Sequence, residues 1–125
     1  MTDYFQLLEE YRNPKNRGTI ENADIVIEGY STSCGDKFSF YIKTENGKII
    51  DAKFDGSGCA ISTVSSSRFC NYIIGKDLKE LEENLPDEKK MCELLEIEEI
   101  GSSRIGCLML PVNALKSLKN KANKS

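Results

Sequence analysis

The sequence predicts an α+β fold, with helices packed on one face of a three-stranded antiparallel sheet. Within residues 25–55, apolar side chains alternate with polar ones, which is the period of a half-buried strand. Asn46 and Gly47 supply the tight turn of a hairpin in the middle of this region. After residue 58 the apolar spacing lengthens to three and four residues, as in a helix. Strands followed by helices indicate an α+β domain.

A short helix is expected before the sheet, over residues 2–12. Apolar side chains recur there at helical spacing, and Pro14 ends the run. The first strand begins near Ile25 in a β-branched segment, and two further strands flank the Asn-Gly turn. The side chains expected to face the core from the second and third strands are Phe38, Phe40, Ile42, Ile50, Ala52 and Phe54.

Four helices are expected after the sheet, at residues 61–73, 77–83, 86–95 and 108–122. Pro86 and Pro111 fit first-turn positions in the third and fourth of these, because a backbone N–H has no helical partner there. In the last helix Val112, Leu115 and Leu118 are expected to face inward. No repeat or linker is visible, so residues 1–125 are expected to form a single domain.

The composition excludes several classes of chemistry. The chain has no histidine, which rules out Ser-His-Asp triads, Cys-His pairs and histidine zinc sites. Its 20 acidic and 17 basic residues give a net charge of -3, so the dense basic surface of a nucleic-acid binder is not expected. No apolar run suits a signal peptide or a membrane span. The protein is therefore expected in the cytoplasm and away from membranes.

The cysteines carry the remaining site chemistry. There are five, and in a reducing compartment an odd number favours thiol or metal chemistry over a disulfide framework. Cys34, Cys59 and Cys107 lie at expected ends of strands or helices, each beside a glycine. At helix N-termini, Cys59 and Cys107 would meet the positive end of the helix dipole, which favours the thiolate. Because loop ends at one edge of a sheet can converge, the three sulfurs are candidate ligands of one centre.

A carboxylate accompanies these sulfurs. Asp36 lies two residues after Cys34, so a short loop can turn both side chains toward one centre. Three thiolates and a carboxylate suit tetrahedral Zn²⁺, and soft thiolates equally suit an iron–sulfur cluster. The residues alone leave both open, along with unrelated buried thiols, because no CxxC pair is present. Oxygen binds cluster iron less tightly than sulfur does, which favours a site that releases its cargo.

Other reactive residues have simpler interpretations. Cys70 and Cys92 are interpreted as core residues, and Cys70 lies three turns along the expected helix from its first residues. Lys37 follows Cys34 by three residues and Arg104 precedes Cys107 by three; either could stabilise a thiolate or persulfide, but we interpret them as solvated. The serine run at residues 65–67 lacks the rest of a phosphate-binding loop, so it predicts the small-residue face of a packed helix.

Several separate motifs resemble, in the same order, those of IscU/NifU-type iron–sulfur assembly scaffolds, including the zinc-containing SufU branch. The matching pieces are NPKNRG at 13–18, CGD at 34–36, the hairpin ENGKIIDAKF at 45–54, GSGCAIS at 56–62, RIGC at 104–107 and LPVNAL at 110–115. The resemblance covers about residues 13–118, which is most of the chain.

The resemblance implies a scaffold that accepts sulfur from a cysteine desulfurase, assembles a labile [2Fe-2S] cluster and transfers it to apo iron–sulfur proteins. Carried over by position, Cys34, Asp36, Cys59 and Cys107 would bind the cluster or Zn²⁺, and Asp36 would keep the cluster transferable. Cys107 is the candidate persulfide acceptor, with Cys34 and Cys59 as alternatives. The alternative function is a zinc-dependent, SufU-like sulfurtransferase that relays the sulfur. A monomer or weak dimer is expected.

Two departures from the family pattern leave the branch open. Gly106 stands where IscU-type members usually have a histidine, and no LPPVK motif occurs, which favours the SufU side. Yet only 47 residues separate Cys59 from Cys107, which looks too short for the insertion typical of SufU members.

Overall fold

The sheet has the topology that the sequence predicts. The structure, a computed structural model, describes residues 4–31, 35–98 and 100–124. Three antiparallel strands lie in the order β1 (Ile25–Ser31), β2 (Asp36–Glu45) and β3 (Lys48–Ser57). Buried and exposed side chains alternate along each strand, so one face of the sheet packs on the core and the other faces solvent.

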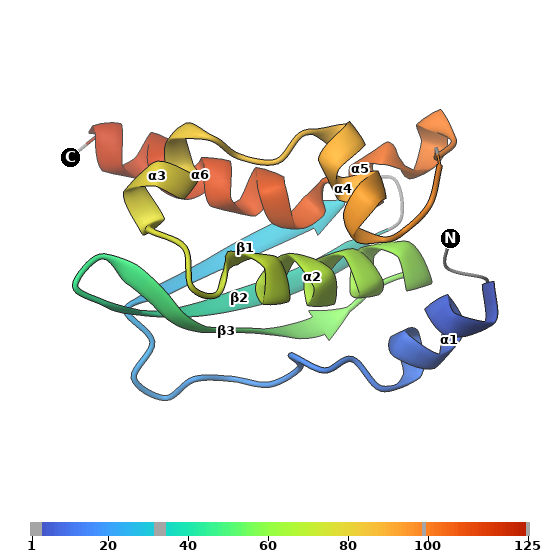
Figure 1. The fold of residues 1–125 in the computed structure, drawn as a ribbon, viewed down its shortest axis with the longest axis horizontal. Coiled ribbons are helices and arrows are strands. Elements are labelled where there is room, and N and C mark those ends of the chain that lie inside the picture. Colours follow the sequence, from blue (N-terminus) through green and yellow to red (C-terminus); the bar gives the residue numbers. More distant parts are fainter. Residues whose placement is uncertain (1–3, 32–34, 99, 125) are drawn as a thin grey trace.

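Helices cover the buried face, and two of them form most of that layer (Figure 1). Helix α2 packs on β3 and helix α6 packs on β1, and the two helices also contact each other. Helix α1 packs against α2. The predicted α+β fold is confirmed. The helices are α1 (Tyr4–Arg12), α2 (Ala60–Ile73), α3 (Leu78–Glu83), α4 (Glu88–Leu94), α5 (Ile105–Leu108) and α6 (Leu110–Lys124), with a 3-10 turn at Ser102–Arg104.

The β2–β3 hairpin turns at Asn46 and Gly47, which have φ angles of 54° and 82°. Positive φ at both central residues is the requirement of the tight turn predicted for this pair. The prediction that Ile50 faces the core is wrong, because Ile49 is fully buried and Ile50 is 48% exposed. A register shift beside Lys43 breaks the alternation there, and one extra residue moves the inward position from 50 to 49.

The NPKNRG stretch covers the free edge of β3. The Gly18 N–H donates to the Phe54 carbonyl at 2.8 Å, and the Phe54 N–H donates to the Asn16 carbonyl at 3.0 Å. The Asn16 side chain also donates to the Ser67 carbonyl of α2 at 3.0 Å. These bonds satisfy an otherwise open strand edge and connect the segment after α1 to the central helix.

Helix α2 is buried along most of its length because the sheet, α1, α4, α5 and α6 surround it. Ser65, Ser66 and Ser67 are at most 1% exposed, which confirms the prediction of a small-residue packing face. The Ser65 hydroxyl donates to the Leu108 carbonyl, so part of this polar surface is satisfied. Cys70 and Cys92 are buried in the apolar core, as predicted.

The later helices differ in detail from their predictions. Pro86 lies before the first turn of α4, because Asp87 accepts the Lys90 N–H as the N-cap. The predicted last helix corresponds to α6, which begins at Leu110. The short helix α5, which ends before Met109, was not predicted. Val112 and Leu115 are buried as predicted, and the Leu118 side chain lies outside the described residues. Within the described ranges, no helix is long and apolar enough to cross a lipid bilayer.

Candidate metal centre

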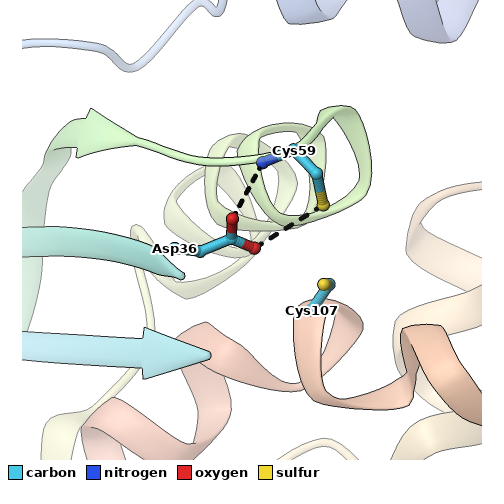
Figure 2. A group of neighbouring side chains, drawn as sticks. All are labelled: Asp36, Cys59 and Cys107. Carbon is cyan, nitrogen blue, oxygen red and sulfur yellow. Dashed lines mark hydrogen bonds between the residues drawn. The ribbon is translucent and has the colours of Figure 1, made fainter. Parts of the chain in front are cut away.

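Three of the four predicted ligands meet at one end of the sheet. Asp36 opens β2, Cys59 lies between β3 and α2, and Cys107 lies in α5 (Figure 2). One ligand atom from each side chain lies within 4.8 Å of the others. Figure 2 shows the carboxylate and both sulfurs turned toward one another from three separate elements. Cys34, the fourth predicted ligand, lies outside the described residues, two positions before Asp36.

The Asp36 carboxylate is held by the chain segment that carries Cys59. Asp36 is only 3% exposed, and its Oδ1 accepts the Cys59 backbone N–H at 3.1 Å. Its Oδ2 lies 3.6 Å from the Cys59 Sγ and accepts the thiol hydrogen. Both carboxylate oxygens therefore contact one residue, which fixes the orientation of this buried group.

Glycine at position 58 makes this close approach possible. A Cβ at Gly58 would lie 2.5 Å from the Ser62 Oγ, 2.8 Å from the Asp36 Cγ and 2.8 Å from the Phe38 Cε2. All three separations are shorter than real side-chain contacts allow. The space occupied by the carboxylate and the serine hydroxyl thus exists because residue 58 has no side chain.

Cys59 is the N-cap of α2. Its φ and ψ of -73° and 172° are extended, and its Sγ accepts the Ser62 backbone N–H at 3.5 Å. The sulfur thereby satisfies one of the N–H groups that a helix leaves unpaired in its first turn. The predicted position of Cys59 at a helix N-terminus is confirmed.

The surroundings of Cys59 favour its thiolate. Burial opposes ionisation, but hydrogen bonds from the Ser62 backbone and hydroxyl and from the Cys107 thiol outweigh it, and the pKa of Cys59 is lowered. The negative charge of Asp36 acts in the opposite direction and is the weakest of these influences. A lowered pKa makes the sulfur a better nucleophile and metal ligand near neutral pH.

Cys107 has a different setting from the one predicted. It is the third residue of α5, a single turn, and does not begin the long final helix. A four-residue helix has little dipole, so the expected stabilisation of a Cys107 thiolate by a long helix is wrong. The residue is fully buried, and its Sγ lies 3.8 Å from the Ser31 Oγ at the end of β1.

The donor set fits a thiophilic metal ion. Two sulfurs and one carboxylate oxygen supply three ligands of the type that Zn²⁺ and iron accept. Gly35 adopts a left-handed φ of 69° immediately before Asp36 and has open space around it.

Lys37, Arg104 and Cys70, which the sequence analysis considered, have other surroundings. Lys37 and Arg104 are exposed, and the Lys37 ammonium lies over the Tyr30 ring at 5.7 Å, which agrees with the solvated interpretation. Burial in the apolar core, with a smaller contribution from Asp51, raises the pKa of the Cys70 thiol far above its ordinary value. Cys70 is therefore a core thiol and no part of the centre.

The sequence interpretation did not identify Ser62 and Gly58 as site residues. The three-residue step from Cys59 to Ser62 is the spacing between an N-cap residue and the N–H that it accepts, so the sequence did contain a signal for Ser62. No sequence signal shows that residue 58 must leave room for Asp36, since these residues meet only through the fold.

Fold and site together define a small α+β domain with a candidate thiolate–carboxylate metal centre. The chain belongs to the family described as the NifU-like N terminal domain, which it matches over residues 4–121.

The chain is also similar to curated proteins. The chain is 38% identical to the iron–sulfur cluster assembly scaffold protein IscU of Thermotoga maritima, over 70% of this chain and 63% of that protein. It is 37% identical to the zinc-dependent sulfurtransferase SufU of Bacillus subtilis, over 58% of this chain and 49% of that protein. The chain thus spans about half to two thirds of the length of these two relatives.

Solved structures agree with the fold. A protein of Fervidobacterium islandicum, described as an iron–sulfur cluster assembly scaffold for the SUF system, superposes with a TM-score of 0.70 and 31% identity, covering 93% of this chain and 94% of that chain. The N-terminal part of a NifU-like protein from Brucella abortus gives the same TM-score at 19% identity, covering 96% of this chain and 93% of that chain, and supports the fold alone.

Proposed function

We propose that this protein is an iron–sulfur cluster assembly scaffold, which builds a labile [2Fe-2S] cluster and transfers it to apo iron–sulfur proteins. One observation carries the proposal: Asp36, Cys59 and Cys107 place an oxygen and two sulfurs within 4.8 Å of one another. Cys34 is the proposed fourth ligand. The curated relatives named as IscU scaffold proteins in several organisms support this assignment.

Sulfur would arrive as a persulfide on a cysteine desulfurase. A thiolate of this protein attacks the outer sulfur, the S–S bond of the desulfurase persulfide breaks, and the desulfurase cysteine leaves as a thiolate. The new persulfide is on the scaffold, with Cys107 as the proposed acceptor and Cys34 and Cys59 as alternatives. Conversion to cluster sulfide then takes two electrons from a separate reductant.

Asp36 has a separate role in the proposal. Thiolates from Cys59 and Cys107 match the soft character of cluster iron, whereas the carboxylate is a harder ligand that iron holds less firmly. The carboxylate position is therefore the one at which a client thiolate enters and the cluster begins to leave. A hydrogen bond from the Cys59 N–H to Oδ1 holds the orientation of the Asp36 carboxylate.

The proposal includes a cellular setting. We place the protein in the cytoplasm, because an odd set of thiols serves metal chemistry in a reducing compartment. We propose that residues 1–125 act as one NifU-like domain, in agreement with the family match over residues 4–121.

A second function is favoured by a specific observation. The similarity to a relative named as a zinc-dependent sulfurtransferase supports a relay, in which zinc holds the same ligands until persulfide sulfur is passed to one of them. Two cysteines, one aspartate and the proposed Cys34 would satisfy tetrahedral Zn²⁺.

Anaerobic reconstitution with iron, L-cysteine and a cysteine desulfurase distinguishes the two functions. The scaffold predicts a visible sulfur-to-iron charge-transfer spectrum and transfer of the cluster to apo-ferredoxin. Cys107→Ala should abolish the spectrum, while Cys70→Ala, which removes an equally buried thiol from the core, should retain it. Stimulation of the desulfurase with firmly retained zinc and no chromophore would establish the relay. A protein that shows neither the charge-transfer spectrum with cluster transfer nor stimulation of the desulfurase would refute both functions.

A further inference from the structure

Ser62 is a fully buried residue in the first turn of α2, one turn beyond Cys59. A buried hydroxyl is unfavourable unless it forms hydrogen bonds. The Ser62 hydroxyl donates to the Cys59 carbonyl at 3.1 Å, and its oxygen lies 3.5 Å from the Cys59 Sγ. Both contacts that the described residues give this hydroxyl therefore lead to Cys59.

The backbone of Ser62 acts on the same sulfur. Its N–H points at the Cys59 Sγ over 3.5 Å, so the sulfur has a backbone donor and a hydroxyl beside it. The Asp36 carboxylate also lies beside the sulfur, with its Oδ2 3.6 Å away. Ser62 and Asp36 thus border the Cys59 sulfur, and the missing Cβ of Gly58 gives both of them room.

The hydroxyl has one hydrogen and two places to donate it. While the Cys59 thiol is protonated, its hydrogen is directed to an acceptor oxygen and the Ser62 hydrogen goes to the carbonyl. When a metal ion replaces the thiol proton, which passes to solvent, the sulfur no longer donates and can accept a second hydrogen bond. A rotation about the Cβ–Oγ bond then directs the hydroxyl hydrogen to the sulfur.

We propose that Ser62 is a positioning residue for Cys59, which orients the sulfur toward the metal centre and donates a second-shell hydrogen bond to it once an ion is bound. The inference deepens the proposed function and rests on it for its biological meaning. A hydrogen bond to a metal-bound thiolate draws electron density from the sulfur, and such partners tune both metal affinity and spectrum.

Cobalt(II) tests the proposal, because it binds zinc-type thiolate sites and gives sulfur-to-cobalt charge-transfer absorption. Ser62→Ala removes the hydroxyl and keeps the backbone donor and the helix. Ser66→Ala is the matched control, since Ser66 is equally buried in the same helix and its Oγ has no hydrogen-bond partner among the described residues. We expect Ser62→Ala to weaken cobalt binding about tenfold and to move the charge-transfer band to longer wavelength. Ser66→Ala should match the wild type in both.

Three results would overturn the inference: no cobalt binding by the wild type, the same affinity and band in Ser62→Ala and Ser66→Ala, or a lost affinity with an unmoved band. The last result would mean that Ser62 only supports the fold. The proposed function fails in a different experiment, if the wild type forms no cluster with the desulfurase. Even then, a cobalt band that shifts in Ser62→Ala relative to the wild type would support the role of Ser62.

Discussion

Replacing Gly58 with alanine tests how closely the metal centre is packed. Gly58 has no left-handed φ, so alanine can adopt its backbone conformation and the effect comes from contact alone. The added Cβ would lie 2.5 Å from the Ser62 Oγ and 2.8 Å from both the Asp36 Cγ and the Phe38 Cε2. Phe38, Asp36 and Ser62 are each at most 3% exposed, so the added carbon must displace packed groups, the Asp36 carboxylate among them.

We expect Gly58→Ala to lower the free energy of unfolding by about 1–3 kcal/mol, the usual cost of forcing an extra carbon into a packed interior. For a domain of this length, the midpoint of thermal unfolding falls by roughly 3–6 °C for each kcal/mol. Cobalt or zinc affinity should fall as well, because the shift moves Asp36 away from the two sulfurs.

Urea unfolding followed by circular dichroism measures the stability, and metal competition measures the affinity. The matched control is Gly101→Ala, because Gly101 has φ and ψ of -65° and 147° and no atom within 4 Å of an added Cβ. The control should unfold no earlier than the wild type. If Gly58→Ala and Gly101→Ala share a urea midpoint and wild-type metal affinity, the packing argument is wrong.

Three further predictions follow from the same structure. Asp36→Ala should give a cluster that survives longer and transfers more slowly, measured by visible absorbance during transfer to apo-ferredoxin; equal lifetimes would contradict the role of the carboxylate. Iodoacetamide should label Cys59 before Cys70 in the native, metal-free protein at neutral pH, because burial raises the pKa of Cys70 while the pKa of Cys59 is lowered. Mass spectrometry measures the order of labelling, with labelling in urea as the control, and earlier labelling of Cys70 would refute this prediction. The Thr44 backbone N–H lowers the pKa of Asp24, so Asp24→Ala should be less stable than the wild type at pH 7, and the difference in stability should shrink as the pH falls below about 4. Urea midpoints of the two proteins that differ equally at pH 7 and pH 3 would refute this prediction.

Local patterns were sufficient for the elements of the fold. Alternation over residues 25–55, the Asn-Gly turn and the helical spacing that follows all reflect interactions between residues near one another in the chain. The same patterns failed at Ile50, because the register shift beside Lys43 depends on how two strands pair.

The site was partly predictable. The sequence identified Asp36, Cys59 and Cys107 as candidate ligands, and the structure brings them within 4.8 Å of one another. It did not identify the separate short helix that holds Cys107, although Pro111, two residues after the break at Met109, marks the first turn of α6.

By itself, the sequence determined the kinds of atom available here: sulfur and carboxylate oxygen at the ends of elements, and no imidazole. Only the tertiary structure decided how these atoms are held. The buried carboxylate of Asp36 faces Cys59, and the absent side chain of Gly58 leaves room for it. The physical reason is that hydrogen bonds and steric limits act through space, between β2 and the start of α2, where neighbours in sequence give no information.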